Sequence, residues 1–270
     1  MSCRNQILAA ACLGAALVLA CGPGEEEVKA TARAEEWSAI ETERGALTEL
    51  RSQLAAARER TSAAEEAPAA EGEASPESQQ EQEQEQELQT RVGEATDRFL
   101  ERLVTFINEH AGFEGEQPPA EVAAAIRMKS SEDVLLAQEY IERGGDHAKA
   151  IDILQSAKAV DPGNSELEAA LAEAERLRYM DQERFSRVEK GMTEQDVRRE
   201  LGQVKHQNVR KYEDGKVVAW FYPKDGGAAA AVFFRPRDGR LLVYDTNFDA
   251  VKSAAERAAS GESEEDAGAD

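Results

Sequence analysis

Residues 191–202 read GMTEQDVRRELG and residues 217–223 read VVAWFYP, and these two stretches decide the fold of the C-terminal part. Thr193 is a favourable N-cap, because its side-chain oxygen can accept a hydrogen bond from an amide of the first helical turn. Asp196, three positions later, can return a contact to the cap, as in a capping box. Gly202 fits the position after the last helical turn. The first stretch therefore predicts a short helix with defined ends.

The apolar residues of this stretch predict how the short helix packs. Val197 and Leu201 are four residues apart, so they face the same side of the helix. Gly191 and Met192 form a tight link to a preceding helix, and the flexible Met192 side chain can fill the junction. We expect this helix to cover a neighbouring layer with its Val197 and Leu201 face.

The second stretch changes from a helical to a strand period. Alternation places Val218, Trp220 and Tyr222 on one face of the strand, and Val217, Ala219 and Phe221 on the other. Both faces are thus apolar. One interpretation is a core strand that flanking helices cover. The other is a strand with surplus apolar surface that binds a partner.

Turn signals divide the rest of the C-terminal part into strands. These signals are Asp214-Gly215, Asp225-Gly226-Gly227 and Asp238-Gly239, and the further strands are expected at 230–234 and 241–244. The predicted module, 181–248, is two helices on a three- or four-stranded antiparallel sheet. The fold class that we predict for the chain is α+β, with a mostly helical N-terminal part.

The ordered set of these features resembles the SmpA/OmlA family, the BamE component of outer-membrane β-barrel assembly, whose wider fold group includes β-lactamase-inhibitor-like proteins. The residues that carry the resemblance are Gly191, Met192, Thr193, Val197, Leu201, Gly202, Trp220 and Tyr222. The resemblance covers about a quarter of the chain. It implies an outer-membrane lipoprotein that binds envelope proteins, the outer-membrane assembly machinery among them. An inhibitor or ligand binder is the alternative that it implies.

Residues 131–164 resemble a tetratricopeptide repeat, a helix–turn–helix unit of 34 residues. The packing positions that match are Ala137, Ile141, Ala150, Ile151, Leu154 and Ala157, and Pro162 ends the second helix. Gly145-Asp146 makes the turn. The resemblance implies a concave surface for a peptide or a partner helix. The alternative is a generic helical hairpin that needs no ligand.

The N-terminus predicts export and lipidation. Arg4 precedes a short apolar run, and Val18-Leu19-Ala20-Cys21 resembles the lipobox of bacterial lipoproteins, in which the cysteine takes a lipid. Gly22 follows that cysteine, where an aspartate would favour the inner membrane. We therefore expect a protein that is lipid-anchored through Cys21 at the periplasmic face of the outer membrane, with no other membrane contact.

Three more helices and a linker are predicted between the anchor and the repeat-like module. The helix at 88–110 has one apolar stripe, formed by Val92, Ala95, Phe99, Leu103 and Phe106, and a short helix with Val122 and Ile126 facing inward follows it. Trp37, Ile40, Leu47 and Leu54 fall at heptad positions, which predicts a weak coiled coil at 36–60 that could pair with a second copy. We divide the chain into a signal peptide at 1–20, a lipidated cysteine and tether at 21–35, an amphipathic helix at 36–60, a Glu/Gln-rich disordered linker at 61–87, helices at 88–130, a repeat-like module at 131–180, an α+β module at 181–248, and a short helix with an acidic disordered tail at 249–270.

Composition bears on the class of function. The chain has 32 Lys and Arg against 54 Asp and Glu, a net charge of −22, which argues against nucleic-acid binding. The three histidines, His110, His147 and His206, lack metal-ligand spacing, and no phosphate-binding loop or nucleophile motif is present. We expect no catalytic residue, metal or cofactor, and a scaffold or accessory factor that works by binding. A passive envelope spacer is a further alternative.

Overall fold

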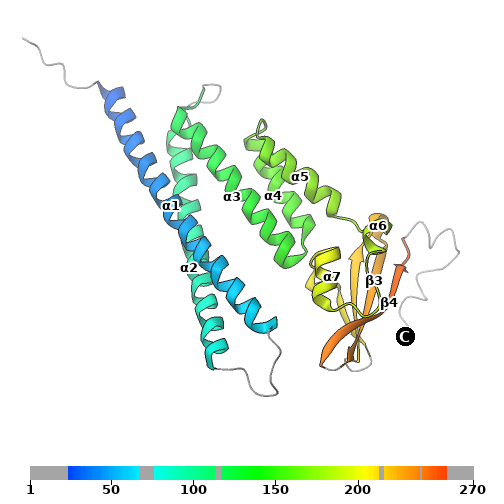
Figure 1. Cartoon of the computed structure of the whole chain (residues 1–270). Coiled ribbons are helices and arrows are strands. Elements are labelled where there is room, and N and C mark those ends of the chain that lie inside the picture. The colour runs from blue at the N-terminus through cyan, green and yellow to red at the C-terminus, as the bar shows by residue number, and fades with distance from the viewer. Residues whose placement is uncertain (1–23, 67–75, 113–116, 213–215, 238, 254–270) are drawn as a thin grey trace, which may run out of the picture. The chain divides into compact units, whose positions relative to one another are not determined.

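The computed structural model describes residues 24–66, 76–112, 117–212, 216–237 and 239–253. These residues confirm the α+β fold class, because helices make up the N-terminal part and a four-stranded antiparallel sheet follows them (Figure 1). The chain divides into two compact units, Met1–Phe99 and Leu100–Asp270. None of the described helices has the apolar length that crossing a lipid bilayer requires. The signal peptide and Cys21 lie outside the described residues.

In the first unit, α1 (Glu25–Glu66) lies beside the first part of α2 (Pro76–His110). The Arg51 guanidinium donates to the Thr96 hydroxyl at 3.2 Å, and Arg58 lies 3.6 Å from Glu85. Three residues of the predicted seam, Ile40, Leu47 and Leu54, are at most 5% exposed, and Trp37 is partly buried. The seam therefore packs within the described chain, and pairing with a second copy stays a prediction.

Both helices are longer than the sequence predicted. The expected tether at 21–35 is helical from Glu25, and the expected linker at 61–87 is helical up to Glu66 and again from Pro76. Glu, Gln and Ala are strong helix formers, and pairs such as Lys29 and Glu25 at 3.0 Å support an exposed helix. Low apolar content argued for disorder, but helix propensity outweighed it in these segments.

The second unit begins with the end of α2 and continues through three helices, which are α3 (Ala120–Gly144), α4 (His147–Val160) and α5 (Ser165–Leu177). The stripe on α2 is confirmed, because Phe99, Leu103 and Phe106 are fully buried. The predicted boundary at 130/131 is wrong, since α3 runs through it without a break. At this point of α3 the Ser130 hydroxyl donates to the Ile126 carbonyl within the helix.

Gly145 and Asp146 form the turn between α3 and α4, as the sequence predicted. Gly145 takes the left-handed conformation (φ 61°), and its amide donates to the Ile141 carbonyl at 3.0 Å. Asp146 then caps α4 by accepting from the Lys149 amide. Asn164 caps α5 in the same way, with the Glu166 and Leu167 amides as donors.

The C-terminal module contains α6 (Gln182–Phe185), α7 (Glu194–Leu201), a 3-10 turn η1 (His206–Asn208), β1 (Val209–Tyr212), β2 (Val217–Pro223), a turn η3 (Asp225–Gly227), β3 (Ala229–Arg237) and β4 (Arg240–Val251). The strands are antiparallel in the order β1-β2-β3-β4. Helices α6 and α7 lie against the sheet (Figure 1). The four-stranded alternative of the prediction is the observed one.

Two details of this module differ from the predictions. β4 continues to Val251, so the helix expected to begin at 249 is wrong for 249–251, because this segment extends the pairing of β4 with the alanine-rich start of β3. His206, which we expected on a strand, lies in the 3-10 turn η1. The Asp214-Gly215 turn and the tail from 254 lie outside the described residues.

Contacts within the second unit join the helical hairpin to the sheet module. The guanidinium of Arg184 donates to the Leu201 carbonyl at 3.0 Å and to the Leu177 carbonyl at 3.5 Å, at the ends of α7 and α5. The Lys205 ammonium lies 2.7 Å from the carboxylate of Asp146. A cation suits a helix C-terminus, because carbonyl dipoles collect there. Arg184 thus fixes two helix ends at once.

Replacing Thr193 by Ala tests the capping box directly. Thr193 accepts from the Asp196 amide, and the Asp196 carboxylate accepts from the Thr193 amide at 3.0 Å. We expect Thr193→Ala to lower the free energy of unfolding by about 1 kcal/mol, measured by urea denaturation. Ser at this position is the control, since it keeps the acceptor.

The same hydrogen bonds predict a pH dependence. The Thr193 amide and hydroxyl hold the pKa of Asp196 below its ordinary value of 3.8. A lowered pKa in the folded state gives stability that is complete above the unfolded pKa and is lost as pH falls through the folded one. We therefore expect this contribution to disappear only below about pH 4, as carboxyl NMR titration of wild type and Asp196→Asn would show.

Candidate binding site

Residues Gly191, Met192 and Thr193, which we call the Gly-Met-Thr corner, are hydrogen-bonded to the edge of the sheet. The Gly191 amide donates to the Val243 carbonyl, and the Val243 amide donates to the Met192 carbonyl, both at 2.8 Å. Thr193 continues this pairing with an isolated bridge to Leu242. Gly191 has φ 95°, which favours glycine. The corner therefore covers part of the outer edge of β4 with backbone hydrogen bonds.

The other motif residues come together in the core of the module. Val197 and Leu201 of α7 belong to one apolar cluster with Trp220 and Tyr222 of β2. The Trp220 ring lies 4.6 Å from the Phe234 ring, and the Tyr222 hydroxyl donates to the Gly202 carbonyl at 3.3 Å. Burial raises the pKa of Tyr222 well above its ordinary value.

The motif is therefore structural within the described residues. Trp220 is 2% exposed and Tyr222 is 4% exposed, so their face of β2 is covered, and on the other face Val217 and Ala219 are buried while Phe221 is partly exposed. Burial along the strand is what the core-strand interpretation predicts, and partly exposed Phe221 is the residue that fits the strand that binds a partner. The motif residues shape the module, and a partner would have to bind elsewhere on it.

The predicted packing positions of the repeat-like module also belong to the core. Ala137, Ala150, Ile151, Leu154 and Ala157 are buried in one cluster between α3, α4 and α5, and Ile141 is partly buried against them. Pro162 is exposed in the turn that ends α4. The structure brings these residues together as a helical hairpin core.

The opposite face of the sheet is a candidate binding surface. Strand register pairs Ala219 with Phe233 and Phe221 with Ala231, so small and aromatic side chains alternate there. Both alanines are fully buried, whereas Phe221 and Phe233 stay partly exposed. The Val218, Trp220 and Tyr222 cluster does not include these residues. We call this surface, formed by Phe221, Phe233, Tyr244, Arg210 and Arg235, the open face.

Aromatic and arginine side chains make up the open face. The Phe233 and Tyr244 ring centroids are 6.3 Å apart, and the Arg235 guanidinium lies 4.0 Å from the centre of the Tyr244 ring. Arg210 is exposed on β1, beside Ala219. Aromatic residues and arginine are enriched in protein–protein interfaces and dominate their binding energy. The composition of the open face therefore suits a protein partner.

Sequence reasoning missed most of the open face. Alternation placed Phe221 on the second face of its strand, which was correct. Phe233, Arg235 and Tyr244 had no signal of their own, because their position beside Phe221 depends on strand register. That register is set by tertiary pairing and by a bulge between Phe233 and Phe234.

An apolar groove in the helical part is a second candidate surface. It has a volume of about 520 Å³ and lies between the end of α2, α3 and α4. Val104, Leu136 and Val160 line it and are 40%, 38% and 68% exposed. Exposed apolar residues that gather in this way mark binding grooves more often than scattered ones.

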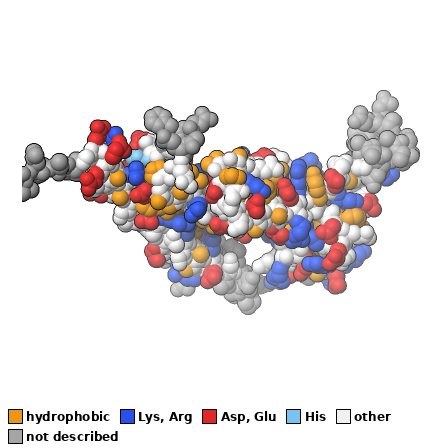
Figure 2. Space-filling model, turned by 90° about the horizontal axis from the view of Figure 1, so that it is seen from above, with side chains coloured by type: hydrophobic (Ala, Val, Ile, Leu, Met, Phe, Trp, Pro, Cys, Tyr) orange, Lys and Arg blue, Asp and Glu red, His pale blue; other side chains and the backbone are white. Residues whose placement is uncertain are grey.

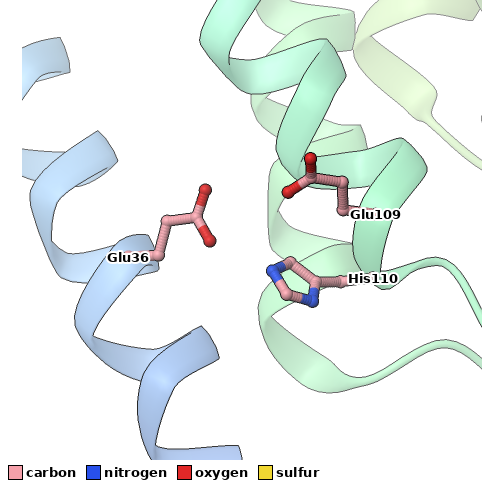
Figure 3. A group of neighbouring side chains, drawn as sticks. All are labelled: Glu36, Glu109 and His110. Atoms are coloured by element: carbon pink, nitrogen blue, oxygen red, sulfur yellow. The ribbon is translucent and has the colours of Figure 1, made fainter. Parts of the chain in front are cut away.

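The face in Figure 2 has charges of both signs, and the described residues include one group of metal-ligand side chains. In the view of Figure 2, acidic and basic side chains are interspersed on the described part of the chain. Figure 3 shows Glu109 and His110 on the last turn of α2, together with Glu36 of α1. Glu36 belongs to the first unit and the other two residues to the second. We therefore derive no ion site from these three side chains.

Comparisons of the chain with protein-family models, with curated proteins and with solved structures return no match.

Proposed function

We propose that this chain is a lipid-anchored scaffold, or accessory factor, at the periplasmic face of the outer membrane, and that it binds other envelope proteins. The observation that carries the proposal is the open face, where partly exposed Phe221 and Phe233 lie beside Arg235 stacked on Tyr244. Aromatic anchors next to arginine are the side chains that dominate protein interfaces.

Two features of the sequence support the place and the class of partner. The lipobox-like residues before Cys21 support lipid anchoring, with the cysteine as the first mature residue. The resemblance to SmpA/OmlA proteins supports a role in outer-membrane assembly. The apolar groove beside Leu136 offers a further surface for a peptide or helix.

Photo-crosslinking in native cells tests the proposal. A photoreactive residue in place of Phe233 should capture outer-membrane assembly proteins, whereas one at the exposed Ser165 of α5 should not. Replacing Cys21 by Ala should move the protein from the membrane fraction to the soluble fraction and weaken the crosslinks. Capture of a single soluble enzyme would favour the inhibitor alternative instead. Equal, non-specific capture at both positions would leave only the passive spacer.

A further inference from the structure

Five arginines line one pocket of the second unit, although the chain as a whole is strongly acidic. The pocket has a volume of about 540 Å³ and lies where α5, α6 and α7 meet the α3–α4 turn. Its arginines are Arg176, Arg184, Arg187, Arg198 and Arg199. The carboxylates among its lining residues are those of Glu142 and Glu200. The lining is therefore net positive, in a chain whose net charge is −22.

Arg184 is the fixed centre of this arginine pocket. It is half-buried, and its hydrogen bonds run to two backbone carbonyls, at Leu177 and Leu201. Within the described ranges, no carboxylate lies within ion-pair distance of it. Burial lowers its pKa from the ordinary value, and the positive charges of Arg176 and Arg187 lower it further, although Asp181 opposes them. An incoming carboxylate would meet a pre-oriented, incompletely compensated cation.

The outer arginines are free to turn toward a ligand. Arg187 lies 3.5 Å from Glu183 and Arg199 lies 3.3 Å from Asp196, and the two arginine side chains are 52% and 67% exposed. Exposed ion pairs of this kind contribute little to stability, so exchanging them costs little. Arg176 differs, because it holds Glu173 through two hydrogen bonds at 2.7 and 2.8 Å.

We propose that the arginine pocket binds an acidic peptide segment of a partner protein. Guanidinium groups bind carboxylates through paired hydrogen bonds, and several of them around one pocket suit several carboxylates in succession. Ile141, Leu177 and Leu201 also line the pocket and can contact the methylene groups of glutamate side chains. A pocket of this volume is larger than a single small anion needs. The site is separate from the open face, so either can fail alone.

Binding of a fluorescent hexaglutamate peptide to the full chain tests the proposal. We expect saturable binding by fluorescence anisotropy that weakens between about 50 and 200 mM salt, because the contacts are electrostatic. The double variant Arg187→Gln/Arg199→Gln should bind at least about tenfold more weakly. The matched control, Lys158→Gln/Lys190→Gln, removes two exposed, ion-paired cations outside the pocket and should change binding by less than about twofold.

Each other outcome overturns the proposal in a defined way. Equal loss in both double variants would show that only net charge matters. Absence of saturable binding would exclude the site. Displacement of the peptide by inorganic phosphate, at the same concentration as the glutamate carboxylates, would show a plain anion site. Stronger binding of phosphatidylglycerol vesicles than of the peptide would show a membrane contact. Circular dichroism of the variants checks that both keep the fold. Crosslinking from Phe233 would remain unaffected in each case, which separates this test from that of the proposed function.

Discussion

Replacing Gly145 by Ala should lower the free energy of unfolding of the second unit by about 3–5 kcal/mol. Gly145 has φ 61°, a conformation that costs an alanine about 1 kcal/mol by itself. The larger part of the cost is steric. A Cβ atom at this position would lie 2.8 Å from the Lys205 amide nitrogen and closer still to the Gln203 carbonyl oxygen. Both are backbone atoms, so neither can rotate away.

Gly144 provides the matched control for this substitution. It precedes Gly145 directly, ends α3 and has open space around it, since the nearest atom to an added Cβ is the Asp146 Cβ at 3.9 Å. Gly144→Ala should therefore be neutral or should stabilise by up to about 1 kcal/mol, because alanine favours the helix. Urea denaturation followed by Trp220 fluorescence measures both, in a Trp37→Phe background that leaves Trp220 as the single tryptophan.

The outcome also bears on how the helical hairpin and the sheet are joined. If the α3–α4 turn and the 203–205 segment are in close contact, Gly145→Ala must either destabilise both or separate them. Separation would break the ion pair between Asp146 and Lys205, which lies beside this contact. A variant as stable as wild type, with an unchanged Trp220 signal, would contradict the close approach.

Local features of the sequence predicted the short-range structure well. The Thr193 capping box, the Gly145 turn and the Asn164 cap all depend on residues within a few positions of one another, so the sequence contains the whole signal. Helical periodicity predicted the buried stripe on α2 for the same reason. Helix boundaries were less predictable. α3 continues past the predicted boundary at 130/131, because the difference in free energy between ending and continuing a helix is small and tertiary packing decides it.

The candidate surfaces could not be predicted from the sequence to the same extent. The strand with Trp220 was predicted to be either a core strand or a strand that binds a partner, and its Trp220 face is core because α6 and α7 cover it. The open face combines β1, β2, β3 and β4, and the arginine pocket combines residues from α3, α4, α5, α6 and α7. Such surfaces depend on register and on helix placement, which involve residues far apart in the chain.

Replacing Trp220 by Ala should be the most destabilising truncation on β2, at about 3–5 kcal/mol. Trp220 is 2% exposed, packs on Phe234 at 4.6 Å between ring centroids, and lies under the Arg198 guanidinium at 4.9 Å. Deleting the indole leaves a cavity in a cluster that α6 and α7 close over, so the surroundings can collapse only in part. Hydrogen exchange of the β3 amides reports the loss, since β3 pairs with β2 along most of its length.

Phe221, the next residue, is the internal comparison, because it lies on the opposite face of the same strand. Its side chain is partly exposed beside Ala231, so Phe221→Ala should cost no more than about 1–1.5 kcal/mol. If the open face binds a partner, this variant should instead lose crosslinks from Phe233 while β3 stays protected. Equal destabilisation by the two truncations would mean that both faces are core, and the open face would then lose its role as a binding surface. Weak effects from Trp220→Ala would contradict the covered face, because a well-packed indole cannot be removed from a closed cluster without a large cost.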